Sequence, residues 1–204
     1  MIRLGLNAKL TRTGYKRPVK TTMITLGVIA DTHIPERARG LNPGVLPAFQ
    51  RAEVKAILHA GDVCIPRVLE ELGELAPVYA VRGNRDWAYL KHLPTSLLLD
   101  FDGVAVGLIH GHGRWRNYLV DRTSYFLEGF RFERYQPRLL AAFPTARVIV
   151  FGHMHIPFNH WVGNQLLFTP GTACCPAEKT TPPSLGLLHI HAGGEIVGEI
   201  ISLE

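Results

Sequence analysis

The residues of this chain that could do chemistry stand directly after short apolar runs. The first run, Thr25 to Ala30, is rich in β-branched residues, has no helical period and is followed by Asp31 and His33. Such a run predicts a strand buried on both faces, and in open α/β sheets ligands bind beyond the carboxyl ends of the strands. A carboxylate and an imidazole two residues apart can turn toward one metal ion.

Four later runs end in the same kinds of side chain, a pattern too regular for unrelated surface loops. The polar residues that follow these runs are Asp62, then Asn84 with Arg85 and Asp86, then His110 and His112, and finally His153 and His155. The glycines beside them, as expected where the backbone turns sharply or approaches an ion closely, are Gly61, Gly83, Gly111 and Gly152. The runs therefore predict one shared site.

The mixture of ligand types indicates which ions such a site would hold. Carboxylate and amide oxygens combined with imidazole nitrogens suit Mn²⁺, Fe, Zn²⁺, Co²⁺ or Ni²⁺ better than Ca²⁺ or a mostly hydrated Mg²⁺. The ligands are too numerous for one ion, so the sequence predicts two divalent transition-metal ions, with Mn²⁺ as the first expectation. Two ions about 3.5 to 4 Å apart can clamp a phosphoryl oxygen and lower the pKa of a shared water.

Five motifs, in this order, resemble those of the calcineurin-like metallophosphoesterases, specifically the small single-domain bacterial and archaeal phosphodiesterases. The motifs, which span the chain from about Met23 to the C-terminus, are Asp31-Thr32-His33, Gly61-Asp62, Gly83-Asn84-Arg85-Asp86, His110-Gly111-His112 and Gly152-His153-Met154-His155. The resemblance implies a first ion held by Asp31, His33 and His155, a second held by Asn84, His110 and His153, and a bridge formed by Asp62. It also implies attack on the phosphate ester by a metal-bridging hydroxide, so that no Ser or Cys nucleophile is required.

Arg85 departs from the larger members of this family, which carry His between the Asn and the Asp of the same motif. That His is thought to protonate the leaving oxygen, whereas arginine keeps its proton near neutral pH and can only grip phosphate oxygens. In those members the Asp of the motif orients the His. Here Asp86 has no such imidazole to orient, so it is expected to brace Arg85 or Arg82. The alternative for Arg85 is a side chain that points into solvent. The predicted catalytic set is Asp62, Asn84, Arg85, Asp86 and His112.

Other polar residues near the motifs have less certain positions relative to the predicted site. The resemblance places His112 near the ions, where it would contact substrate or orient a ligand. Arg37 and Arg39 lie in the loop after the first motif and could reach a substrate phosphate, although two solvated arginines are the simpler expectation. His59 lies inside a strand and is expected to be a hydrogen-bonded structural residue.

The order of the predicted strands, helices and turns indicates two mixed sheets. Strand, helix and strand follow one another over 56–59, over 66–75 and from Val78, as in a parallel sheet. Turn signals at Asp102-Gly103, Gly163-Asn164 and Gly193-Gly194 then add antiparallel strands, the first pair over 96–101 and 104–110. Further helices are predicted over 45–51 and over 118–142, the latter interrupted by Pro137. An α/β fold, a four-layer αββα sandwich of two mixed β-sheets flanked by helices, satisfies this pattern and is also what the resemblance implies.

Composition predicts a soluble protein in a reducing compartment. With 204 residues, 47% hydrophobic and 19% charged, the chain can bury one substantial core. No apolar run approaches the roughly 20 residues that span a bilayer, so no membrane association is expected. The three cysteines, Cys64, Cys174 and Cys175, form no Cys-x-x-Cys motif. This argues against a disulfide framework and a thiolate zinc site, and favours the cytoplasm.

The formal charge of +5 is concentrated at the N-terminus. Residues 1–22 carry six basic and no acidic side chains, whereas the remainder carries 16 basic and 17 acidic ones. We therefore expect a basic extension over 1–22 and a single metallophosphoesterase domain over 23–204. The extension would be a flexible tail, the product of a start codon assigned too early, or a basic arm or transit segment.

These observations predict a dinuclear-metal-dependent phosphoesterase, specifically a phosphodiesterase, that hydrolyses a small-molecule phosphate ester. The alternative is a non-catalytic metal-binding interaction scaffold of the same fold, like a vesicle-trafficking subunit that resembles the family but has lost ligands. Every ligand position of the motifs is filled here, which favours the enzyme. The near-neutral domain argues against a nuclease and against nucleic acid as a partner. The sequence leaves open whether the chain forms a homo-oligomer.

Overall fold

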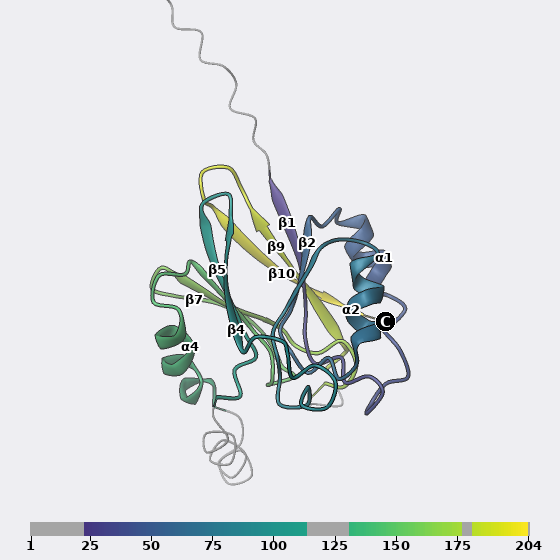
Figure 1. The fold of residues 1–204 in the computed structure, drawn as a ribbon. Helices are drawn as coiled ribbons and strands as arrows, with labels where there is room; N and C mark the ends of the chain where they lie inside the picture. Colours follow the sequence, from purple (N-terminus) through teal and green to yellow (C-terminus); the bar gives the residue numbers. More distant parts are fainter. Residues whose placement is uncertain (1–22, 114–130, 177–180, 204) are drawn as a thin grey trace, which may run out of the picture.

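The computed structural model describes residues 23–113, 131–176 and 181–203, which form two five-stranded sheets packed face to face (Figure 1). The first sheet, in the order β10-β9-β1-β2-β3, contains β1 (Ile24–Ile29), β2 (Ala56–His59), β3 (Val78–Ala80), β9 (Ser184–Ile190) and β10 (Ile196–Ser202). The second, in the order β4-β5-β6-β8-β7, contains β4 (Ser96–Phe101), β5 (Val104–Ile109), β6 (Val148–Phe151), β7 (Pro157–Val162) and β8 (Gln165–Pro170).

Both sheets mix parallel and antiparallel strands, as predicted. β1, β2 and β3 run parallel, and β9 and β10 complete the first sheet with antiparallel pairings. In the second sheet β5, β6 and β8 run parallel, with β4 and β7 antiparallel at the two edges. Parallel neighbours end at the same edge of a sheet, so the loops after β1, β2 and β3 lie together, as do those after β5, β6 and β8.

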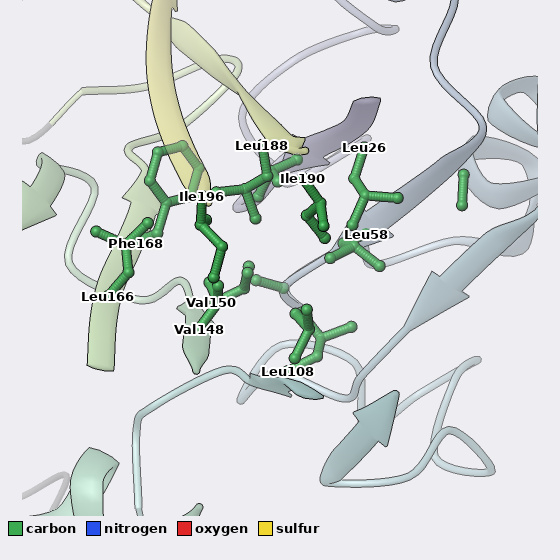
Figure 2. Packing of buried hydrophobic residues seen from close by; sticks show 14 of the residues in the cluster. Leu26, Leu58, Leu108, Val148, Val150, Leu166, Phe168, Leu188, Ile190 and Ile196 are labelled. Carbon is green, nitrogen blue, oxygen red and sulfur yellow. The ribbon is translucent and has the colours of Figure 1, made fainter. Parts of the chain in front are cut away.

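The largest core lies between the sheets and follows the period-two alternation of the strands. Leu26 and Val28 of β1 belong to this layer, whereas Ile29 packs on the opposite face, and Val148 and Val150 of β6 enter the layer from the second sheet. Figure 2 shows the aliphatic side chains of both sheets meeting there. Each buried Leu or Val contributes roughly 1.5 to 3 kcal/mol, so this layer fixes how the two sheets stack.

Two helices cover the outer face of the first sheet (Figure 1). They are α1 (Val45–Arg51) and α2 (Pro66–Gly73), and both contribute buried side chains to one apolar cluster with β1 and β2. Gly27 of β1 permits the close approach of α1, because a Cβ at this position would lie 2.8 Å from the Phe49 ring. The helix predicted over 45–51 is confirmed, and the one predicted over 66–75 ends two residues earlier.

The outer face of the second sheet is covered by η1 (Phe132–Arg134) and α4 (Gln136–Ala142). Leu139 of α4 is buried against β6 and β8, which completes the four-layer αββα sandwich and confirms the predicted fold. The expectation that Pro137 interrupts a helix is wrong for the described part of 118–142. Pro137 lies in the first turn of α4, where a missing N–H costs nothing.

Three turn predictions are confirmed, since β4 and β5, β7 and β8, and β9 and β10 pair as antiparallel neighbours. The rest of the helix predicted over 118–142, up to residue 130, lies outside the described residues, as does the basic extension over 1–22. Within the described part of the chain, no helix is both long enough and apolar enough to cross a membrane.

Candidate metal centre

The seven predicted metal ligands all stand just after parallel strands. Asp31 and His33 follow β1, and Asp62 and Asn84 follow β2 and β3 of the same sheet. The ligands that follow β5 and β6 of the second sheet are His110, His153 and His155. The two sheets meet at this edge, because the backbone N–H of His153 donates to Asp31 Oδ2 over 2.9 Å.

One group of ligands, which we call the first-ion group, consists of Asp31, His33 and His155. Its two imidazole Nε2 atoms are 3.0 Å apart, and Asp31 Oδ1 lies 3.5 Å from that of His155 and 3.8 Å from that of His33. Asp31 Oδ1 is buried and has no hydrogen-bond partner among the described residues. Three donor atoms that converge in this way fit a divalent cation, which would satisfy the carboxylate oxygen and the facing nitrogen lone pairs together.

A second group, the second-ion group, consists of Asn84, His110 and His153. His110 Nε2 lies 3.1 Å from Asn84 Oδ1, and the rings of His110 and His153 have centroids 5.2 Å apart. Asp62 lies between the two groups, because its Oδ2 is 3.7 Å from His33 Nε2 and its Oδ1 is 3.5 Å from His110 Nε2. A carboxylate that offers one oxygen to each group is placed as a bridging ligand requires.

Hydrogen bonds outside the two groups orient the imidazole rings. His110 Nδ1 lies 2.7 Å from the carbonyl oxygen of Ala60, and His155 Nδ1 lies 2.7 Å from that of Cys175. A carbonyl can only accept, so each Nδ1 carries the proton and donates it. The Nε2 atom of each ring is therefore the one left to bind metal, in the arrangement common to histidine ligands.

The backbone of the ligand loops is held in an unusual conformation. Five of the seven predicted ligands have positive φ in the left-handed region, namely Asp31 (53°), His33 (47°), Asp62 (55°), His153 (75°) and His155 (56°). Such residues are uncommon outside glycine, and each costs of order 1 to 3 kcal/mol unless the surroundings impose it. Clusters of strained residues mark functional sites, so this geometry supports five of the seven ligands, although Glu53, Cys64 and Asp102 also have positive φ.

Glycine is required where the loops touch. A Cβ on Gly83 would overlap the Asp62 carboxylate, and one on Gly152 would lie 2.7 Å from the Ala60 carbonyl oxygen and 3.0 Å from Asp31 Oδ2. Larger residues at either position would push the ligand loops apart.

Burial and charge set the protonation states of the first-ion group and of the bridge. Burial lowers the pKa of His33 to about 4 and raises that of Asp62 to about 6. Burial also favours neutral His155, yet the Asp31 carboxylate outweighs it and raises the pKa of His155 to about 11. Metal binding to such a group releases protons, because the ion binds neutral imidazole and ionised carboxylate.

Asp86 has a different surrounding from the one predicted. Its carboxylate accepts three backbone N–H groups, with Oδ2 bonded to Asp62 and Gly83 and Oδ1 bonded to Cys64, over 2.7 to 2.9 Å. Asp86 is fully buried, so this carboxylate ties the loop after β2 to the loop after β3. The expectation that it braces an arginine is therefore corrected.

The two arginines near Asp86 have other partners. Arg85 Nη1 lies 3.9 Å from Glu36, and Arg82 donates to the carbonyl oxygen of Lys91. The side chain of Arg85 is 41% exposed, while its backbone N–H donates to Asp62 Oδ1 over 2.7 Å. The backbone of Arg85 thus orients the bridging carboxylate, and its guanidinium is accessible beside the site.

The remaining candidate residues differ in how closely they approach the two ion groups. The His112 ring lies 5.2 Å from that of His110, and its Nδ1 is buried with no hydrogen-bond partner in the part of the chain that the structure describes. Arg37 is exposed, and its guanidinium lies 3.8 Å from Cys175 Sγ beside the first-ion group. Arg39 is exposed and makes no contact with the site among the described residues. His59 is buried and accepts the backbone N–H of Gly61, which agrees with its predicted structural role.

Cys175 is a site residue that the sequence analysis missed. Its Sγ lies 3.8 Å from His155 Nδ1 and 3.8 Å from Arg37 Nη1. The thiol of Cys174 donates to it and lowers the pKa of Cys175. A signal was available, because β8 is a sixth apolar run and is followed by Gly171 and then these cysteines.

Comparisons with known proteins agree with this geometry. The sequence model of the calcineurin-like phosphoesterase superfamily domain matches residues 24–193. A probable metallophosphoesterase of Methanothermobacter thermautotrophicus is 38% identical over 176 residues, which cover 86% of this chain and 91% of the relative. Phosphodiesterase YfcE of Escherichia coli is 32% identical over 124 residues, which cover 60% of this chain and 58% of the relative.

Among solved structures, Vacuolar Protein Sorting 29 from Cryptosporidium parvum superposes with a TM-score of 0.62 at 20% sequence identity. The match covers 88% of this chain and 98% of the other, and at this identity it shows a shared fold alone. The family model and the archaeal relative go further, and the chain belongs to the calcineurin-like phosphoesterase superfamily.

Proposed function

We propose that this protein is a dinuclear-metal-dependent phosphodiesterase that acts on small-molecule phosphate esters. The observation that carries the proposal is the position of Asp62, whose two oxygens face the first-ion group and the second-ion group separately. The name of the E. coli relative supports a phosphodiesterase, and that relative is matched over only part of its length.

Each ligand residue has a defined task in this proposal. Asp31, His33 and His155 would hold one ion and Asn84, His110 and His153 the other, with Asp62 between them. When bound, two ions would supply Lewis-acid stabilisation of the phosphoryl group and a water of lowered pKa. The protein keeps the ligands in place through Ala60 and Cys175, whose carbonyl oxygens orient two of the imidazole rings.

Arg85 would act on the substrate rather than on the metals. Its exposed guanidinium can hold phosphate oxygens in a bidentate manner and offset negative charge in the transition state. It cannot donate a proton to the leaving oxygen near neutral pH. The enzyme should therefore favour esters with acidic leaving groups, such as aryl phosphodiesters.

Metal analysis and a paired substrate assay test the proposal. The purified protein should bind two divalent ions per chain and hydrolyse bis(p-nitrophenyl) phosphate faster than p-nitrophenyl phosphate when Mn²⁺ is supplied. Asp62→Ala should lose most metal and all turnover, because among the described residues only Asp62 faces both ion groups. Asp100→Ala removes an exposed carboxylate near the end of β4 and should change neither.

The outcomes separate the competing functions. Two ions and normal turnover in Asp62→Ala would show that the bridging assignment is wrong. A wild-type protein that binds no metal and turns over neither substrate would favour the interaction scaffold of the same fold.

A further inference from the structure

The segment that follows β8 is fastened directly to the first-ion group. The hydroxyl of Thr172 donates to the carbonyl oxygen of Asp31 over 2.8 Å and accepts the backbone N–H groups of Cys174 and Cys175 over 3.3 Å. The backbone N–H of Ala173 donates to the carbonyl oxygen of Ala30. The two cysteines are therefore held by the chain that carries the first metal ligands, and they are not freely placed surface residues.

Two atoms of Cys175 contact the ring of His155. Its carbonyl oxygen accepts the Nδ1 proton of that ring, and its Sγ lies 3.8 Å from the same nitrogen. Cys175, His33 and His155 each offer a ligand atom, and the three atoms lie within 4.8 Å of one another. On a tetrahedral ion, Zn–N and Zn–S bonds of about 2.1 and 2.3 Å put a nitrogen and a sulfur about 3.6 Å apart. The three ligand atoms can therefore share an ion after side-chain shifts of about 1 Å.

We propose that the Cys175 thiolate is a ligand of the ion held by His33 and His155, and that it makes this half of the centre selective for Zn²⁺, Fe²⁺ or Co²⁺ over Mn²⁺. Thiolates are soft ligands that favour these ions, whereas a site built from carboxylate and imidazole alone accepts Mn²⁺ readily. The proposal rests on the metal centre of the proposed function and refines the expectation of Mn²⁺.

The neighbouring thiols have separate roles. The Cys174 thiol is 2.7 Å from Cys175 Sγ and 3.5 Å from the Asp31 carbonyl oxygen, so it stabilises the thiolate as a hydrogen-bond donor and positions it. Cys64 is buried and also lies within 4.8 Å of a ligand atom of His33, together with Glu36. Cys64 is therefore the competing thiolate ligand and the appropriate control.

The absorption spectrum of the Co²⁺-loaded full-length protein tests the proposal. A thiolate ligand produces a sulfur-to-cobalt charge-transfer band in the near ultraviolet, while visible ligand-field bands report cobalt binding whatever the ligands. The wild type and Cys64→Ser should show both kinds of band. Cys175→Ser should keep the visible bands and lose the charge-transfer band, with Zn²⁺ affinity lowered about 10- to 100-fold or more, the scale of a disturbed metal site.

X-ray absorption of the Zn²⁺-loaded wild type needs no substitution and should show one sulfur neighbour at about 2.3 Å on one of the two ions. Visible bands without a charge-transfer band, or a charge-transfer band that Cys64→Ser removes and Cys175→Ser keeps, would overturn the Cys175 assignment and leave the dinuclear centre standing. A protein that binds neither Co²⁺ nor Zn²⁺ would overturn the metal centre itself.

Discussion

Asp86 offers the sharpest test of how the ligand loops are held together. The sequence motif suggests a catalytic carboxylate, whereas the structure gives it three backbone N–H partners, on Asp62, Gly83 and Cys64. Substitution by alanine leaves three buried donors without an acceptor, and each unsatisfied donor costs about 1 to 3 kcal/mol. The loss of roughly 3 to 9 kcal/mol is comparable with the whole stability of a typical domain, about 5 to 15 kcal/mol.

Asp86→Asn is the milder and more informative change. An asparagine that keeps its oxygen toward Asp62 and Gly83 must turn its NH₂ group toward the N–H of Cys64, so the acceptor for Cys64 is lost and two donors face each other. The expected cost is about 1 to 3 kcal/mol. For a domain of this size that is roughly 2 to 12 °C in melting temperature.

Urea unfolding in the presence of a chelator measures this cost without a contribution from bound metal. Asp100→Asn is the matched control, because Asp100 is exposed and asparagine can accept the same N–H of Gly103, so its stability should change by less than about 0.5 kcal/mol. A purely catalytic Asp86 would give the opposite result: Asp86→Asn would unfold at the same urea concentration as this control while losing turnover.

Three further expectations follow from the site and the sequence. His155→Ala should weaken the first ion about 10- to 100-fold while leaving some occupancy of the second, as measured by competition with a chelator. Deleting residues 1–22 should leave melting temperature and turnover unchanged, since all motifs and β1 follow them, and a large fall in melting temperature would show that they pack on the domain. Rates across substituted phenyl phosphodiesters should depend steeply on leaving-group acidity. Arg85→His should raise the rates for the poorest leaving groups by about 10² to 10⁴, which flattens that dependence. A flat dependence in the wild type would mean that another acid is present.

The placement of the ligands could be predicted from the sequence because strand ends are dictated by local patterns. Runs such as the one before Asp31 are apolar without a helical period, and parallel strands must end at one edge of a sheet. Turn residues such as Asp102-Gly103 fix where antiparallel strands reverse, and the structure has those hairpins.

The contacts between loops could not be predicted in the same way. The partners of Asp86 include backbone groups 22 and 24 residues away, and backbone N–H groups carry no side-chain signal in a sequence. Pro137 was expected to interrupt a helix over 118–142, because a helical pattern in a sequence does not show at which residue the first turn begins. Cys175 was missed because its role depends on the Thr172 hydroxyl, which brings its loop to Asp31.

The left-handed backbone of the site has a geometric cause. In a regular strand, residues two apart point to the same face but lie about 6.5 Å apart, since the rise is about 3.3 Å per residue. Ligand atoms on one ion must be closer together than this. Positive φ at both members of the pairs Asp31 with His33 and His153 with His155 curls each segment out of the extended conformation.

The residue between the two ligands of each pair stabilises the curled backbone. Thr32 is buried, and its hydroxyl donates to the carbonyl oxygen of Val63, while Met154 is buried in the cluster under α4. Such contacts belong to the protein alone and do not depend on a bound ion. The hydrogen bond of Thr32 and the packing of Met154 therefore help to offset the strain that positive φ places on the ligand loops.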